Sequence, residues 1–163
     1  MIGRILAVDP GEKRLGIAIS DPTGMIASPL RVVAHVARAA DAAAIARLAQ
    51  EQGAVQIVVG WALDAEGQPT PQARHAERLV EALRAVTPLP VILWDESGST
   101  QAARSARIAM GVSRRKRSGH LDEIAATVIL QSYLESLAYR NFRLQSSEEA
   151  NDGQSSADTT SQA

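Results

Sequence analysis

Acidic residues stand at the ends of the most apolar segments of this chain. The apolar run RILAVD ends in Asp9, and the run PVILWDE ends in the acidic pair Asp95 and Glu96. A further acid, Asp122, lies close to the beginning of another apolar segment. Three convergent carboxylates without a Cys or His partner suit a hard divalent cation such as Mg²⁺ or Mn²⁺. The residue types therefore predict a metal centre, provided that the fold brings the three segments together.

Each acid also has a simpler explanation. Asp9 could be a solvated turn residue, because Asp favours turns. Glu96 could begin a loop, and Asp122 could complement the dipole at the start of a helix. A single metal centre would account for all three, whereas three unpaired carboxylates in one place would repel one another and raise each other's pKa.

The pattern of apolar runs predicts the elements that must position these acids. Three strands joined by short turns with Pro and Gly indicate an antiparallel meander, and Pro29 places the third strand at an edge. The expected strands are residues 4–9, 15–20, 25–33, 55–60 and 90–95. The expected helices are residues 38–52, a segment that starts at Pro71 after the N-cap Thr70, about 100–110, and about 120–138.

The order βββαβαβαα predicts an α/β fold with a mixed five-stranded sheet flanked by helices. Strands that alternate with helices pair in parallel through right-handed crossovers. Ligands of open α/β sheets bind outside the carboxyl ends of the parallel strands. We therefore expect Asp9 and Glu96 to lie at one edge of the sheet.

Charge is distributed unevenly along the 163 residues. The net charge is −1, but residues 144–163 contain four acids and no Lys or Arg, so residues 1–143 carry a net charge of +3. We expect one domain over 1–143 and a disordered acidic tail over 144–163, because the tail has too few large apolar side chains to offset its ordering entropy. Aromatic residues make up only 3% of the chain, which argues against a broad stacking platform for single-stranded nucleic acid.

Features that the sequence lacks indicate the cellular compartment of the protein. The chain has no Cys, no apolar run of about 18 residues and no signal-peptide pattern at its start. We expect a cytoplasmic protein without a membrane partner, as a monomer or a weak dimer.

Basic residues occur where a phosphate backbone could be met. Lys13 and Arg14 follow Asp9 on a predicted turn. The densest basic run comprises Arg114, Arg115, Lys116 and Arg117. Such groups contact nucleic-acid phosphates and make affinity depend on salt; alternatively, they are simply solvated loop residues.

Several segments together resemble one known family. Residues 6–21, LAVDPGEKRLGIAISD, resemble the D-x-G-x-K-R-x-G-x-A-x-S-D signature of the YqgF/RuvX family. Further similar blocks are VVG at 58–60, WDES at 94–97, and GVSRRKR and LDEIAATVILQSYLE within 111–135. The resemblance extends in order over residues 4–139.

The resemblance implies a ribonuclease H-like fold and a metal-dependent nuclease with Asp9, Glu96 and Asp122 as its metal-binding, catalytic carboxylates. It implies RNA as partner, through processing of the 5′ end of pre-16S ribosomal RNA, or branched DNA, since the family was earlier associated with Holliday junctions. The chain departs from the family at Ser97, where Arg is usual, and at the inserted Gly98. A catalytically silent nucleic-acid-binding module on the same fold therefore remains an alternative.

A phosphate-binding ATPase of the actin and sugar-kinase type also begins with a D-x-G segment. That architecture needs two such domains around a nucleotide cleft, and 163 residues are too few. The sequence leaves open whether RNA or DNA is the substrate.

Overall fold

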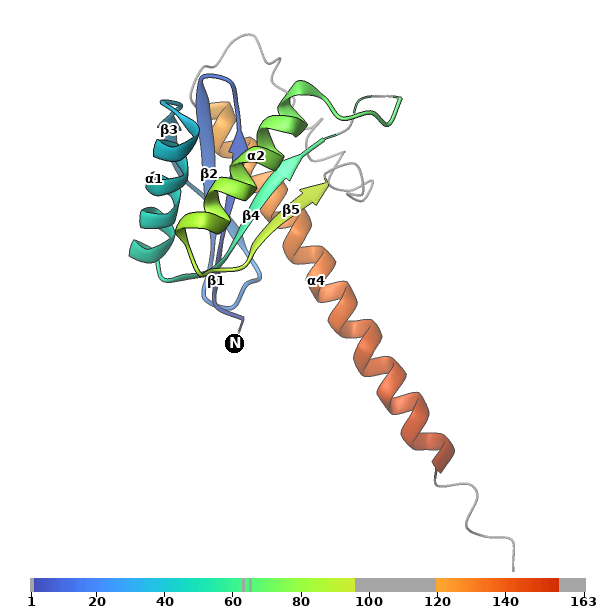
Figure 1. Cartoon of the computed structure of the whole chain (residues 1–163). Coiled ribbons are helices and arrows are strands. Elements are labelled where there is room, and N and C mark those ends of the chain that lie inside the picture. Colours follow the sequence, from blue (N-terminus) through green and yellow to red (C-terminus); the bar gives the residue numbers. More distant parts are fainter. Residues whose placement is uncertain (1, 63, 65, 96–119, 156–163) are drawn as a thin grey trace, which may run out of the picture.

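A mixed five-stranded sheet lies at the centre of the molecule (Figure 1). The computed structural model describes residues 2–62, 64, 66–95 and 120–155, and the side chains of residues 124–148 in the last helix. The strands are β1 (Arg4–Pro10), β2 (Arg14–Ser20), β3 (Ala27–Ala34), β4 (Ala54–Trp61) and β5 (Val91–Asp95). Their order across the sheet is β3-β2-β1-β4-β5.

The first three strands form the predicted antiparallel meander. β1 pairs with β2 and β2 pairs with β3 in antiparallel fashion, whereas β1, β4 and β5 run parallel. Pro29 lies on β3, an edge strand, and a bulge falls beside it, between the partners of Ile17 and Ala18. The prediction of a mixed five-stranded α/β sheet is confirmed.

Helices cover both faces of the sheet. α1 (Arg38–Glu51) and α2 (Pro71–Val86) lie on one face, and α4 (His120–Ser155) crosses the other (Figure 1). α2 begins as predicted, because the Oγ1 atom of Thr70 accepts a hydrogen bond of 3.0 Å from the backbone N–H of Ala73. The helix expected over about 100–110 lies outside the described residues.

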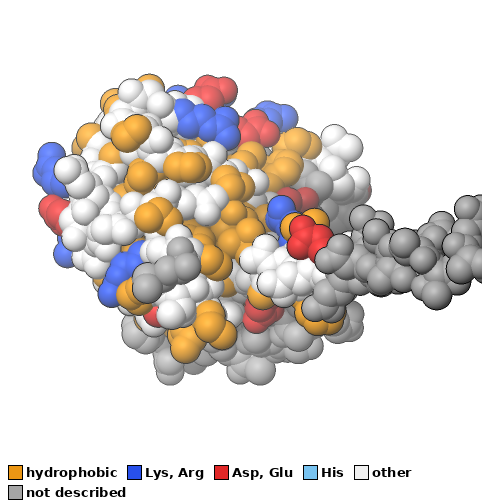
Figure 2. Space-filling model, turned by 90° about the horizontal axis from the view of Figure 1, so that it is seen from below, with side chains coloured by type: hydrophobic (Ala, Val, Ile, Leu, Met, Phe, Trp, Pro, Cys, Tyr) orange, Lys and Arg blue, Asp and Glu red, His pale blue; other side chains and the backbone are white. Residues whose placement is uncertain are grey.

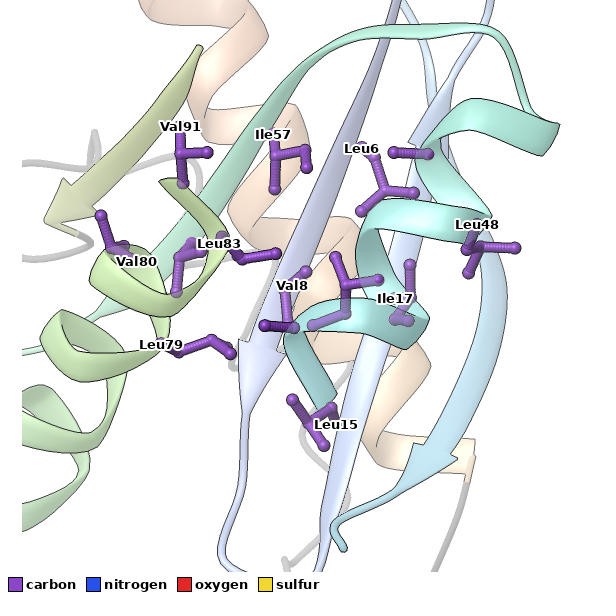
Figure 3. Packing of buried hydrophobic residues seen from close by; sticks show 14 of the residues in the cluster. Leu6, Val8, Leu15, Ile17, Leu48, Ile57, Leu79, Val80, Leu83 and Val91 are labelled. Carbon is purple, nitrogen blue, oxygen red and sulfur yellow. The ribbon is translucent and has the colours of Figure 1, made fainter. Parts of the chain in front are cut away.

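Two apolar cores result from the alternation of side chains along the strands. Leu6 and Val8 of β1 face α1 and α2, in the core drawn in Figure 3, whereas Ile5 and Ala7 face α4. Leu79 and Leu83 of α2, with Val80, fill the first core around Ile57 and Val91. The second core is completed by buried residues of α4, namely Ala126, Ile129, Leu130, Tyr133 and Leu134.

α4 is longer than the sequence predicted. The expected helix ended near residue 138, with a disordered tail from 144, but the structure continues the helix to Ser155. The extension leaves the body of the molecule (Figure 1), and residues 138–148 are exposed. Lengthening a helix that is already formed costs far less than starting one, so the segment is helical without burying apolar surface. Residues 156–163 lie outside the described residues.

The end of the sheet at which β1 and β4 begin carries exposed apolar side chains. Ile2, Met25, Ile26 and Val55 are each 45% exposed or more. Figure 2 views this end and shows apolar side chains across the middle of the face, with charged groups mostly toward its rim. Among the described residues, no helix is both long and apolar enough to span a membrane.

Candidate active site

Asp9 stands at the carboxyl end of the central strand β1. It pairs with Gly16 of β2, and its side chain is half-buried. Because side chains alternate along a strand, Asp9 shares the face of Ile5 and Ala7, which pack against α4. The sheet therefore presents the Asp9 carboxylate on its α4 side.

Both neighbours of Asp9 within the sheet are glycines. Gly16 lies opposite it on β2, and on β4 Gly60 follows Val59, the partner of Val8. A Cβ atom on Gly60 would lie 2.4 Å from Cδ1 and 2.9 Å from Cγ1 of Ile129. Gly60 thus permits α4 to approach the sheet closely beside Asp9.

α4 begins at the same edge of the sheet. Tyr133 accepts a hydrogen bond of 2.9 Å from Gln56 near the start of β4, whereas Ile129 lies against Gly60 near the end of β4. Going back along α4 therefore leads toward the carboxyl edge, as Figure 1 also shows. Asp122 precedes Ile129 by seven residues, or about 10 Å of helix at 1.5 Å per residue. The backbone of Asp122 therefore lies at or beyond the edge where β1 ends. Its side chain is not among those that the structure describes.

The third predicted ligand follows β5. Glu96 lies outside the described residues, but β5 ends at this edge, where Asp95 pairs with Trp61. Trp94 packs on the α4 side and Leu93 on the α1–α2 side. Alternation places Asp95 on the side away from Asp9, so Asp95 is the less suitable member of the Asp95–Glu96 pair.

Within the part of the chain that the structure describes, no three His, Asp or Glu side chains gather closely enough to hold a metal ion. Of the predicted carboxylates, Asp9 alone has a described side chain. The carboxylate oxygens of Asp9 and its position at the sheet edge suit a hard cation. β5 and α4 also reach this edge, which fits a metal site shared by Asp9, Glu96 and Asp122.

The turn after Asp9 is tightly closed. Gly11 donates a hydrogen bond of 2.9 Å to the carbonyl of Arg14, and a Cβ atom on Gly11 would lie 2.4 Å from that oxygen. Lys13 is exposed, and Arg14 is half-buried at the start of β2. Both predicted phosphate contacts thus lie at the edge where Asp9 stands. Arg114, Arg115, Lys116 and Arg117 lie outside the described residues.

A second polar cluster escaped the sequence analysis. His35 follows β3, and its Nδ1 atom lies 2.5 Å from Oδ2 of Asp41, a buried residue of α1. The ring of His75 on α2 contacts that of His35 edge to face, at 5.4 Å between centroids. Burial, then the nearby charges of His35 and Arg38, lower the pKa of His75. The missed signal was Asp41 itself, an acid four residues before Ile45 on the buried side of α1.

A family model and several curated proteins match most of this chain. The model of the family described as "RuvX: Holliday junction resolvase" matches residues 3–136. A protein of Geobacillus kaustophilus named "Putative pre-16S rRNA nuclease" is 43% identical over 135 residues, which is 82% of this chain and 98% of that protein. A protein of the same name from Roseiflexus sp. is 37% identical over 134 residues, covering 82% and 95%.

One solved structure shares the fold at low sequence identity. It is the RuvC protein of T. thermophilus in complex with a Holliday junction substrate, with a TM-score of 0.54 at 15% identity, over 83% of this chain and 96% of that one. The fold is thus the RuvC-like ribonuclease H fold. With the family match and both relatives covering at least four fifths of the sequence, this chain belongs to the RuvX/YqgF family.

Proposed function

We propose that this protein is a metal-dependent nuclease that hydrolyses phosphodiester bonds of structured RNA. The observation that carries the proposal is the placement of Asp9. This carboxylate stands at the end of the central strand, between two glycines, at the edge where α4 begins and β5 ends. Family membership supports the same reaction, since relatives covering most of the chain bear nuclease names.

Asp9, Glu96 and Asp122 would together hold Mg²⁺ or Mn²⁺. When bound, such ions activate water and neutralise charge on the phosphate oxygens during hydrolysis. The part of the protein is to hold the carboxylates in place: β1 fixes Asp9, β5 leads to Glu96, and α4 carries Asp122 in its first turn. If the three acids meet at this edge, their mutual repulsion requires a cation to compensate it.

Binding of the substrate would use the basic residues near this edge. Lys13 and Arg14 lie on the turn and strand directly after Asp9, where they can meet the phosphates that flank the scissile bond. We assign to the basic run of residues 114–117 the contacts with RNA phosphates that lie farther from the scissile bond. Phosphate contacts of this kind provide affinity and carry no sequence information.

Precursor 16S ribosomal RNA is the substrate that we favour, with cleavage at its 5′ end in the cytoplasm. The support for this substrate is the name carried by relatives at 37% and 43% identity, and the choice of the 5′ end follows from the resemblance to the family. Branched DNA is the second candidate, because the family description names a Holliday junction resolvase. A catalytically silent binding module is the third, and its support is Ser97 at a position where the family usually has Arg.

A cleavage panel separates these candidates. The purified protein is incubated with structured RNA, single-stranded RNA and four-way DNA junctions, each with Mg²⁺, with Mn²⁺ and with chelator. We expect metal-dependent cleavage of structured RNA. Cleavage of junctions alone would favour the resolvase, and binding without cleavage under every condition would favour the silent module.

The role of the basic run is tested in the same panel. Replacing all four residues of 114–117 with Gln should weaken RNA binding and flatten its salt dependence, because fewer counterions are released. Cleavage at saturating RNA should largely survive. An unchanged salt slope would remove this run from the binding site.

A further inference from the structure

The polar cluster at the carboxyl end of β3 is built around a buried carboxylate. Asp41 is 2% exposed, and both of its oxygens are used: Oδ2 lies 2.5 Å from Nδ1 of His35, and Oδ1 accepts a hydrogen bond of 3.1 Å from the backbone N–H of Val36. A buried carboxylate needs such partners to offset the loss of its hydration. The pair therefore holds the connection between β3 and α1 in one conformation.

This connection is joined to the turn that carries Lys13. The backbone N–H of His35 donates a hydrogen bond of 2.9 Å to the carbonyl of Lys13, and Ala34 pairs with Arg14 in the sheet. The other side of the same turn is held by α2, where Nε2 of Gln72 donates a hydrogen bond of 3.0 Å to the carbonyl of Pro10. The residues after Asp9 are thus held by the connection between β3 and α1 on one side and by α2 on the other.

His75 closes the cluster from α2. Its ring meets that of His35 at an interplanar angle of 87°, and it limits the room for the His35 ring to turn away from Asp41. Among the described residues its Nε2 atom is buried without a hydrogen-bond partner. The ring of His75 therefore contributes packing to the cluster, and the polar connections come from Asp41 and His35.

We propose that Asp41 and His35 are positioning residues for substrate binding: they fix the β1–β2 turn so that Lys13 and Arg14 meet the phosphate backbone of the nucleic acid. This inference rests on the proposed function for its substrate. A side chain that must span from a turn to a phosphate binds best when the turn is already ordered, because less entropy is lost on binding. Asp41 and His35 would act through the turn and not touch the substrate.

The chain offers a matched control at the other end of β3. Asp21 accepts hydrogen bonds from the backbone N–H groups of Met25 and Ile26, at 2.9 and 2.8 Å, and so fixes the turn before β3. Both acids hold backbone N–H groups in loops next to β3, but Asp21 lies at the end of the sheet remote from Asp9. A purely structural role for Asp41 predicts the same behaviour for Asp41→Ala and Asp21→Ala.

The experiment compares Asp41→Ala, Asp41→Asn and Asp21→Ala in the full chain, with RNA affinity and cleavage kinetics as readouts. We expect Asp41→Ala to raise Kd and KM by roughly three- to ten-fold, the scale of one or two weakened charged contacts, with a smaller change in kcat. Asp41→Asn keeps an acceptor for the backbone N–H of Val36 and can make a neutral hydrogen bond to His35, so it should recover part of the affinity. Asp21→Ala should leave Kd and KM unchanged.

Hydrogen exchange provides a readout that needs no substrate. The amide of His35 should exchange faster in Asp41→Ala, beyond any change in global stability, and not in Asp21→Ala. Unchanged exchange at His35 would overturn the structural part of the inference. Faster exchange with an RNA affinity equal to that of Asp21→Ala would overturn its functional part. If Asp41→Ala does not fold, Asp41→Asn and His35→Gln carry the same comparisons.

Failure of the proposed function gives a different pattern. A wild-type protein that neither binds nor cleaves nucleic acid would overturn that function together with the substrate role of Asp41. The exchange comparison would still decide whether Asp41 and His35 hold the turn.

Discussion

Replacing Gly60 with Ala perturbs the contact that lets α4 approach the sheet beside Asp9. The new Cβ atom would lie 2.4, 2.9 and 3.1 Å from Cδ1, Cγ1 and Cγ2 of Ile129. Ile129 is 1% exposed and lies in the core beneath α4, so its side chain cannot move into solvent. Either the Ile129 side chain or α4 itself must shift.

The magnitude follows from two opposing effects. Overpacking a buried site costs roughly 1–3 kcal/mol, whereas replacing Gly with Ala within a strand recovers roughly 0.5–1 kcal/mol of backbone entropy. The difference between these ranges is about 0–2.5 kcal/mol, so we expect Gly60→Ala to lower the free energy of unfolding by about 1 kcal/mol, or the Tm by a few degrees. Urea unfolding followed by circular dichroism measures the change.

A double-mutant cycle assigns the loss to this contact. Ile129→Val removes Cδ1, the nearest atom, and alone should cost about 0.5–1.5 kcal/mol. The double variant should be more stable than the sum of the two losses predicts, since the contact is relieved in part. A Gly60→Ala protein as stable as the wild type, or strict additivity, would refute the close approach of α4 at this position.

Three further predictions concern stability. Ser20→Ala should cost about 1–3 kcal/mol in urea unfolding, because the buried N–H of Ile5 donates to Ser20 Oγ at 2.8 Å and would be left unpaired; a neutral effect would mean that this N–H finds another acceptor. The pKa of His75 is lowered from 6.5 on folding, so at this residue the unfolded state binds more protons than the folded state below neutral pH. The free energy of unfolding should therefore fall as the pH is lowered from about 7 to 5. His75→Gln should reduce this slope, and an unchanged slope would contradict the assignment. Deleting residues 144–163 should leave the Tm essentially unchanged, because residues 144–148 are exposed; a large fall would mean that the tail contacts the body.

Much of the fold was predictable because local signals agreed with the tertiary structure. Continuous apolar runs marked the strands of the sheet interior, and Pro29 correctly indicated an edge strand. Thr70 and Pro71 marked the start of α2 to the residue. The extent of α4 was not predictable from composition, because its exposed continuation depends on a helix already anchored by Leu130 and Leu134.

The candidate site was predictable only in part. The apolar strand that ends in Asp9 predicted that this residue lies at an edge of the sheet. The parallel pairing of β1, β4 and β5 brings the carboxyl ends of these strands to that same edge. The roles of Gly60 and Asp41 depend on neighbours that are distant in sequence or on another element. Gly60 contacts Ile129, which lies 69 positions later in the sequence. The pattern of residues within β4 does not predict that contact.

Cleavage by Asp9→Asn tests the central claim most directly. Asp95→Asn is the matched control, because Asp95 stands at the same edge on the opposite face of the sheet. Cleavage of structured RNA is measured against Mg²⁺ and Mn²⁺ concentration, with circular dichroism as the test of folding. We predict that Asp9→Asn folds but loses metal-dependent cleavage, that Glu96→Gln and Asp122→Asn behave similarly with far from additive losses, and that Asp95→Asn stays active. A fully active Asp9→Asn protein, or wild-type cleavage that persists in chelator, would contradict the assignment of this edge as the active site.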